Sequence, residues 1–177
     1  MVIQPTAQHR VSYENAQSAD NYGMELEFKQ NLGALNPRLY TWSVSTNLTL
    51  LQSDIQLSDS TQGIQTSSRR PLHGQSPYLF NLNLNYRHPL WATQADLFLH
   101  VFGKRISEVG SKPLPDIYEM PHPDLDLVLR QPLSTKSTLK LAFENILDPE
   151  VKFKQVNQYT EISRKGSSFS IGFSYSN

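Results

Sequence analysis

Apolar and polar residues alternate with a period of two along most of the chain. In residues 76–89, "SPYLFNLNLNYRHP", every second position from Tyr78 to Tyr86 is aromatic or leucine, and asparagines occupy three of the four positions between them. Successive side chains of a β-strand point to opposite faces, so this segment predicts a strand with one apolar and one amide-rich face. Helical periodicity is scarce elsewhere, and Pro and Gly lie mostly between the alternating segments. The pattern therefore predicts an all-β fold.

Eight segments are predicted to be strands. Most of them reach the roughly 9 to 11 residues that a tilted membrane strand needs, whereas a globular strand has about 5 or 6. The first is the weakest, because Pro5 interrupts its start. The eight segments are residues 2–14, 21–32, 39–57, 76–89, 95–106, 123–133, 137–147 and 169–177.

The connections between these segments alternate in length. Residues 58–77, 107–123 and 149–168 form three long connections, well beyond a hairpin loop of about 2 to 5 residues. The connections between them, such as "GALNPR" and "HPLWATQ", are short. All long loops would thus leave one end of the sheet and all short turns the other. This arrangement predicts an all-β, antiparallel up-and-down transmembrane β-barrel wall of about eight strands.

The charged residues of the strands indicate which face is wet. A charge on the lipid face near the membrane midplane costs about 2 to 4 kcal/mol, so the polar face should line a hydrated lumen. Aromatic residues near the short turns should form a girdle at the membrane interface. The charges are Glu25, Glu27, Lys29, Asp124, Asp126, Arg130, Lys140 and Glu144, and the girdle residues are Tyr40, Trp42, Tyr86 and Trp91.

The bulk composition narrows the class of protein further. Sixteen Lys and Arg balance sixteen Asp and Glu, so net charge gives no sign of a nucleic-acid partner. The mean hydropathy of −0.46 is compatible with strands that have one wet face. The 177 residues contain no cysteine and no run of 18 apolar residues, which excludes disulfides and a transmembrane helix. The N-terminus lacks the apolar core of a signal peptide.

Catalytic and metal-binding patterns are absent from the sequence. The five histidines, at positions 9, 73, 88, 100 and 122, are too scattered for metal-ligand spacing. Asp124 and Asp126 share a strand face, but no nucleophile or base accompanies them, so they are interpreted as lumen-facing structural residues. We therefore predict no enzyme activity, no metal and no cofactor.

Candidate ligand-binding residues lie in the long connection that ends at residue 77. Arg69, Arg70, His73 and Gln75 are the candidates, because arginines beside a long loop can contact an anionic ligand or lipopolysaccharide phosphates. The alternative, which we favour, is that Arg70 anchors the loop to the rim of the barrel. Gly74, between two prolines, is expected to adopt a positive φ in a stiff turn.

Five motifs in a fixed order resemble the C-terminal third of TonB-dependent outer-membrane receptors. The match begins at "NYGMELEF" and spans nearly the whole chain. The motifs that follow are "RPLHGQSPYLFNLNLNY", "FGKRISEVG", "PDIYE" and "ENILD".

The resemblance implies a plugged barrel of roughly 22 strands, of which residues 1–177 would supply about the last eight. Members of this family take up scarce nutrients such as iron-siderophore complexes with energy relayed through TonB. The expected partners are outer-membrane lipid and the remainder of the receptor barrel and plug. TonB itself would act only through the missing N-terminal part.

Two departures from the family leave an alternative open. The signal peptide, TonB box, plug and about fourteen strands are missing, and the position in phase with the aromatic residues of the last strand is Asn177. The alternative is a self-contained small eight-stranded barrel, either a membrane protein or a soluble lipid-binding module. Closure separates the two hypotheses, since a self-contained barrel pairs its first and last strands, whereas a receptor segment leaves both edges open.

Overall fold

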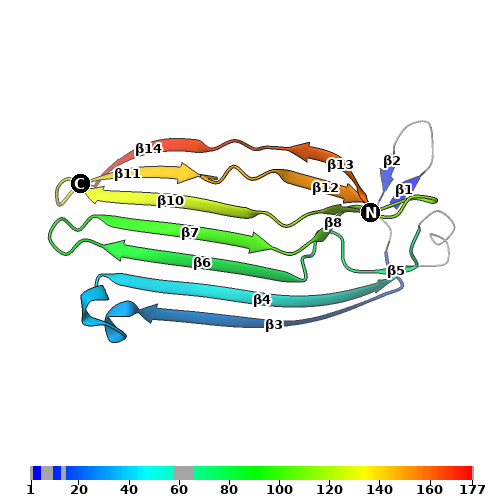
Figure 1. Ribbon diagram of the computed structural model, residues 1–177, viewed down its shortest axis with the longest axis horizontal. Helices are drawn as coiled ribbons and strands as arrows, with labels where there is room; N and C mark the ends of the chain where they lie inside the picture. Colours follow the sequence, from blue (N-terminus) through cyan, green and yellow to red (C-terminus); the bar gives the residue numbers. More distant parts are fainter. Residues whose placement is uncertain (1, 5–9, 13–14, 58–65, 177) are drawn as a thin grey trace.

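The computed structural model describes residues 2–4, 10–12, 15–57 and 66–176. Its main element is an antiparallel sheet whose long strands are neighbours in chain order, as in an up-and-down barrel wall (Figure 1). The short strand β5 (Arg69–Arg70) pairs with the end of β4. The long strands are β3 (Ser18–Asn31), β4 (Trp42–Gln56), β6 (Tyr78–Arg87), β7 (Gln94–Phe102), β10 (Pro123–Pro132), β11 (Ser137–Glu144) and β14 (Ser168–Tyr175).

The strand register separates the side chains into two faces. Glu27, Asn47, Asn81, His100 and Asp124 follow one another as direct cross-strand partners from β3 to β10, in the middle of what we call the polar face. The neighbouring row forms part of the apolar face and contains Phe28, Thr46, Leu82, Leu99 and Leu125. The predicted alternation of faces is therefore confirmed across five strands.

Most buried hydrophobic side chains lie at or beyond the ends of the long strands. The apolar face of the main sheet has no second layer of described residues over it. Among the described residues, Phe102 is the last residue of β7, and Ile106, Val109 and Val151 lie in the connections beyond the long strands; all four are buried. By contrast, Phe28 of β3 and Ile171 of β14 are exposed by 53% and 66%. An apolar face of this size without a covering layer indicates contact with a nonpolar solvent.

Short turns join the strands at the opposite end. Two single-turn 3₁₀ helices, η1 (Leu32–Ala34) and η2 (Pro37–Leu39), connect β3 to β4, and the Asn31 and Asn36 side chains cap them. Two of the predicted girdle residues touch here, since the rings of Trp42 and Tyr86 lie 4.8 Å apart. Trp91 stacks on His88 at 4.7 Å and, like Tyr40, is exposed.

The expected long loops differ from the observed structure. Parts of residues 107–123 and about half of residues 149–168 are strand, and these strands form a second sheet in the order β13-β12-β9-β8. The pattern was misread because the turn between β12 and β13 lacks Gly and Pro and instead places Val156 at φ 55°. The strands are β8 (Arg105–Glu108), β9 (Ile117–Glu119), β12 (Val151–Gln155) and β13 (Gln158–Ser163).

The first predicted strand is also wrong. Residues 2–14 contain two short strands, β1 (Val2–Gln4) and β2 (Arg10–Ser12), which pair with each other and not with the main sheet. Pro5, which lies between β1 and β2 in the sequence, is outside the described residues. The C-terminal residue Asn177 is also outside them. The main sheet thus has seven long strands and β5, rather than eight long strands.

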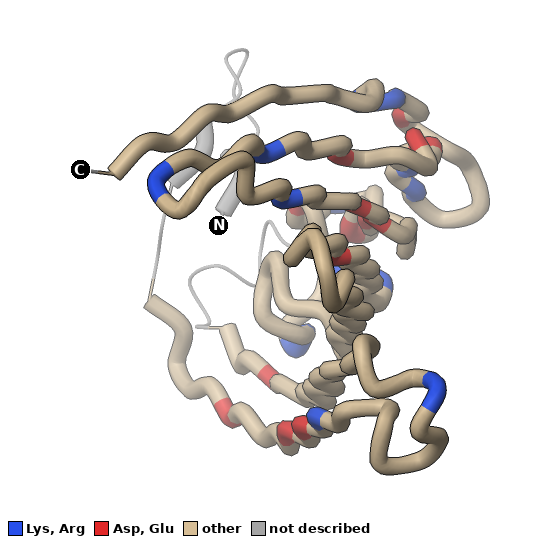
Figure 2. The backbone as a smooth tube through the Cα atoms, turned by 90° about the vertical axis from the view of Figure 1, so that its left-hand side faces the viewer, with Lys and Arg blue, Asp and Glu red and all other residues tan. Residues whose placement is uncertain are grey.

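The two edges of the main sheet do not meet. Viewed along the strands, the sheet is an open arc with β3 and β14 at its ends (Figure 2). In the described part of the chain, β3 pairs only with β4 and β14 only with β11. The described strands therefore do not form the self-contained closed barrel of the alternative hypothesis. No helix among the described residues is long and apolar enough to span a membrane.

Candidate functional site

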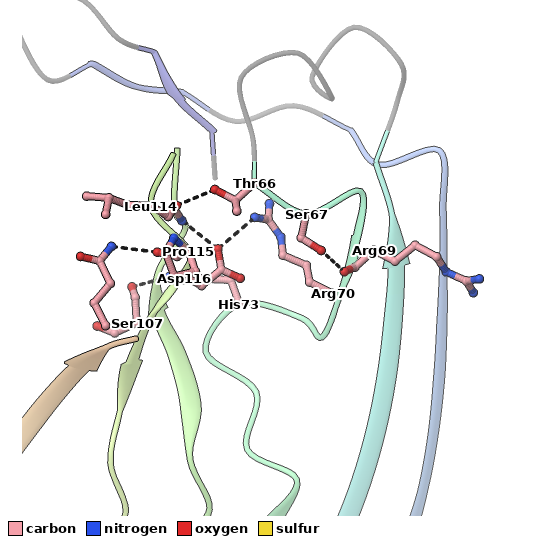
Figure 3. Close-up of polar contacts among 11 residues, drawn as sticks. Thr66, Ser67, Arg69, Arg70, His73, Ser107, Leu114, Pro115 and Asp116 are labelled. Carbon is pink, nitrogen blue, oxygen red and sulfur yellow. Dashed lines mark hydrogen bonds and ion pairs between the residues drawn. The ribbon is translucent and has the colours of Figure 1, made fainter. Parts of the chain in front are cut away.

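Residues 66–77 and the β8–β9 hairpin meet at the end of the sheet opposite the short turns (Figure 3). Arg70 is 8% exposed, and its Nη1 atom lies 3.7 Å from Oδ1 of Asp116, which is equally buried. The same Oδ1 atom accepts a hydrogen bond of 2.7 Å from the Gly110 backbone N–H. We call the contacts between these two segments the Arg70 clasp.

Four further hydrogen bonds complete the Arg70 clasp, and one of them runs from the Thr66 hydroxyl to the Leu114 carbonyl at 2.5 Å. The His73 ring donates from Nε2 to the Ser107 carbonyl at 2.7 Å. The buried Ser76 hydroxyl donates to the Gly103 carbonyl at 3.0 Å. The Gly74 N–H donates to the Ile106 carbonyl at 2.9 Å. Gly74 has φ 77°, as predicted for this turn. The loop is thus held to residues 103–116 by several polar contacts, although the Gln75 Oε1 atom of the same loop is buried without a hydrogen-bond partner among the described residues.

Burial controls the electrostatics of the Arg70 clasp. It lowers the pKa of the Arg70 guanidinium, while the nearby Asp116 carboxylate acts in the opposite direction. Burial also raises the pKa of the Tyr118 phenol, and Asp116 raises it further, so the hydroxyl is protonated at neutral pH. The pair is therefore a buried cation and anion beside a neutral hydrogen-bond donor.

The structure does not gather the four predicted ligand-binding residues into one pocket. Arg69 points away from Arg70 (Figure 3), its side chain is 66% exposed, and it pairs with Asp54. Arg70 and His73 serve the clasp, which agrees with the anchoring interpretation of Arg70. Gln75 donates from Nε2 to Oδ1 of Asn21 on β3, at 3.1 Å. Ligand binding by these residues stays a prediction.

The clasp brings several of the sequence motifs into contact. "RPLHGQSPY" supplies Arg70 and Ser76, "FGKRISEVG" supplies the Gly103 carbonyl, and "PDIYE" supplies Asp116. The last two motifs are also joined by an ion pair of 2.7 Å between Arg105 and Glu119. Segments that are far apart in the sequence therefore form a single contact region.

The middle of the polar face carries a depression of about 320 Å³. Three carboxylates, those of Glu27, Asp124 and Asp126, line it together with His100, whose Nδ1 atom lies 2.6 Å from Oδ1 of Asn81. Asp126 accepts a hydrogen bond from the Asn145 backbone N–H at 2.8 Å. Neither these side chains nor any other His, Asp or Glu of the described residues form a group of three that could hold a metal ion.

One group of polar residues was missed by sequence reasoning. Lys154 lies on β12 directly opposite Tyr118 of β9, and the Lys104 ammonium group lies 3.9 Å from the centre of the Tyr118 ring. Residues 149–168 were expected to be a loop, so Lys154 had no predicted partners. The alternation within "VKFKQ" was the signal that could have placed it on a strand.

Gly110 provides a direct test of how tightly the clasp is packed. A Cβ atom at this position would lie 2.3 Å from the Pro115 carbonyl carbon, so Gly110→Ala must displace backbone. We expect a loss of about 1 to 3 kcal/mol in unfolding free energy, measured by denaturant titration in lipid vesicles. Gly172→Ala is the control, because its Cβ would meet only the Lys140 Cβ, at 3.8 Å. Equal losses for both variants would contradict the tight packing.

No family model and no curated protein matches the chain. Among solved structures, it is similar to the FrpB iron transporter from Neisseria meningitidis (F3-3 variant), with a TM-score of 0.61 and 14% sequence identity. The match covers 89% of this chain and 23% of that transporter. The chain has the fold of a barrel segment. Its antiparallel up-and-down strands correspond to part of a large outer-membrane barrel, and the matched protein is a transporter.

Proposed function

We propose that residues 1–177 form the C-terminal part of the barrel of a TonB-dependent receptor in the outer membrane of a Gram-negative bacterium. In this role the chain is a section of transporter wall for the uptake of a scarce nutrient such as an iron-siderophore complex. The observation that carries the proposal is the open sheet of seven long strands, with an uncovered apolar face and two unpaired edges. The fold likeness to an iron transporter supports it.

The proposed partners follow from the surfaces of the sheet. Lipid would contact the apolar face, and the receptor's remaining strands would pair with the edges of β3 and β14. The polar face, with Asn81 and Asn83 at its centre, would face the plug or the path of the solute. TonB would act only through the N-terminal part of the receptor. The assignments of lipid, neighbouring strands and plug can be tested one at a time, because each concerns a different surface of the sheet.

The membrane assignment can be tested with the full chain. We expect a far-UV β-sheet spectrum only in detergent or lipid vesicles, because in water the apolar face has no cover.

Tryptophan quenching is a second test of the membrane assignment. Trp42 lies at the short-turn end of the apolar face, so brominated lipids should quench tryptophan fluorescence. The variant Trp91→Phe, with Trp42 as the only remaining tryptophan, assigns the quenching to Trp42. A folded, soluble chain without detergent would contradict the proposal.

The receptor assignment requires a separate test, because a membrane strand could belong to another kind of barrel. The coding region upstream of this chain should encode a plug and further strands. Coexpression of that region with this chain should restore iron-dependent growth to a strain that lacks its own receptor, and removal of β14 should abolish it. Growth that is unaffected by the loss of β14 would contradict the role of this segment in the wall.

A further inference from the structure

A second depression, of about 360 Å³, lies beside the Arg70 clasp, between the β8–β9 hairpin and the β12–β13 turn. Asp116 belongs to both, so the depression and the clasp share a wall. The residues that line it are Lys104, Pro115, Asp116, Tyr118, Met120, Lys154, Val156 and Asn157.

The residues that line this depression carry more positive than negative charge. Lys104 and Lys154 both line it, and neither forms an ion pair with a carboxylate of the described residues. Asp116, the carboxylate that lines the depression, is already paired with Arg70. The Lys104 ammonium group lies 3.9 Å from the centre of the Tyr118 ring, and Lys154 is the cross-strand partner of Tyr118. Two positive charges without a carboxylate partner among the described residues therefore share one partly enclosed space, which gives it a positive potential.

Neutral hydrogen-bond donors accompany the two charges. The Tyr118 phenol, like any tyrosine with an ordinary or raised pKa, is protonated at neutral pH, and burial and Asp116 shift its pKa further upward. The Asn157 amide stands on the rim of the same depression, in the two-residue turn between β12 and β13. Two ammonium groups, a phenol and an amide form a donor set that complements the oxygens of a carboxylate or a phosphate.

We propose that Lys104, Tyr118 and Lys154 bind an oxyanion, the carboxylate or phosphate group of a solute or of lipopolysaccharide. The inference rests on the proposed function, because in an outer-membrane barrel the end opposite the short turns faces the cell exterior, where both sources occur. The two lysines supply charge, and Tyr118 supplies a directed hydrogen bond. The site is distinct from the predicted candidates Arg69, Arg70, His73 and Gln75, none of which lines this depression.

Lysine acylation of the full chain in lipid vesicles tests the site. Citrate, inorganic phosphate and lipopolysaccharide-containing vesicles are three separate arms, read out by mass spectrometry of each lysine. We expect Lys104 and Lys154 to react severalfold more slowly in at least one arm. Lys152 should keep its rate, since its ammonium group already pairs with Glu150 at 2.9 Å. Protection by citrate or phosphate alone identifies a solute, and protection by lipopolysaccharide alone identifies the lipid.

Variants make the assignment specific. Lys104→Gln and Lys154→Gln should each weaken binding of the protecting anion roughly tenfold, because each removes one charge-assisted hydrogen bond. Lys152→Gln, on the same strand as Lys154, should leave affinity unchanged. If the chain keeps its β-sheet spectrum but no arm protects the lysines, or all three lysines are protected equally, the proposed oxyanion site is wrong. Loss of that spectrum in vesicles would instead overturn the proposed function on which the site rests.

Discussion

Replacing Arg70 with alanine is expected to lower the unfolding free energy of the vesicle-inserted chain by about 3 to 5 kcal/mol. The reason is the Asp116 carboxylate, which would remain buried with its negative charge uncompensated. Arg69→Ala is a matched control at the adjacent position. Its ion pair with Asp54 is largely exposed, so its removal should change stability by about 0 to 1 kcal/mol.

A double variant separates the charge from the packing. Arg70→Met with Asp116→Asn removes both charges but keeps an amide oxygen that can accept the Gly110 hydrogen bond. We expect it to be more stable than Arg70→Ala, because no isolated charge stays buried. Urea titration followed by tryptophan fluorescence gives all of these free energies. Losses that are equal for Arg69→Ala and Arg70→Ala would show that the clasp does not depend on the buried pair.

An arginine in place of Leu82 should lower the unfolding free energy by about 2 to 4 kcal/mol in vesicles. Leu82 lies in the middle of β6 on the apolar face, between Thr46 and Leu99 on the neighbouring strands. An arginine there would have to enter the hydrocarbon region. The same urea titration measures the effect.

The matched control for Leu82→Arg is Asn83→Arg, one residue further along the same strand. Asn83 belongs to the polar face and lines the depression that also contains Glu27, Asp124 and Asp126. An arginine at this position can approach their carboxylates, so the loss should be much smaller. If Asn83→Arg were the more damaging of the two, the assignment of lipid and lumen to the two faces would be reversed.

The alternation of residues was sufficient to predict the main sheet because each strand carries its own local signal. Leu82 and Leu99 occupy equivalent phases of two separate alternating segments, and the register brings them opposite each other. Asn81 and His100 do the same on the polar face. When strands are joined by short turns, the order in the sequence is also the order in the sheet.

The clasp and the second sheet could not be predicted in the same way. Arg70 and Asp116 meet only because two loops fold toward each other, and neither loop carries a signal for its partner. The β12–β13 hairpin was missed because Val156 and Asn157 form an unusual two-residue turn that normally favours Gly or Asn. The prediction for residues 2–14 was wrong because two short strands that pair with each other have the same sequence pattern as one interrupted strand.

The odd number of long strands has a consequence for assembly. With seven crossings, β3 starts at the end with the Arg70 clasp, and β14 finishes at the end with the short turns (Figure 1). Bacterial single-chain outer-membrane barrels have an even number of strands. In such a barrel the remaining strands must be odd in number, so that the edges of β3 and β14 both find antiparallel neighbours. The parity of this segment thus constrains the strand count of whatever completes it.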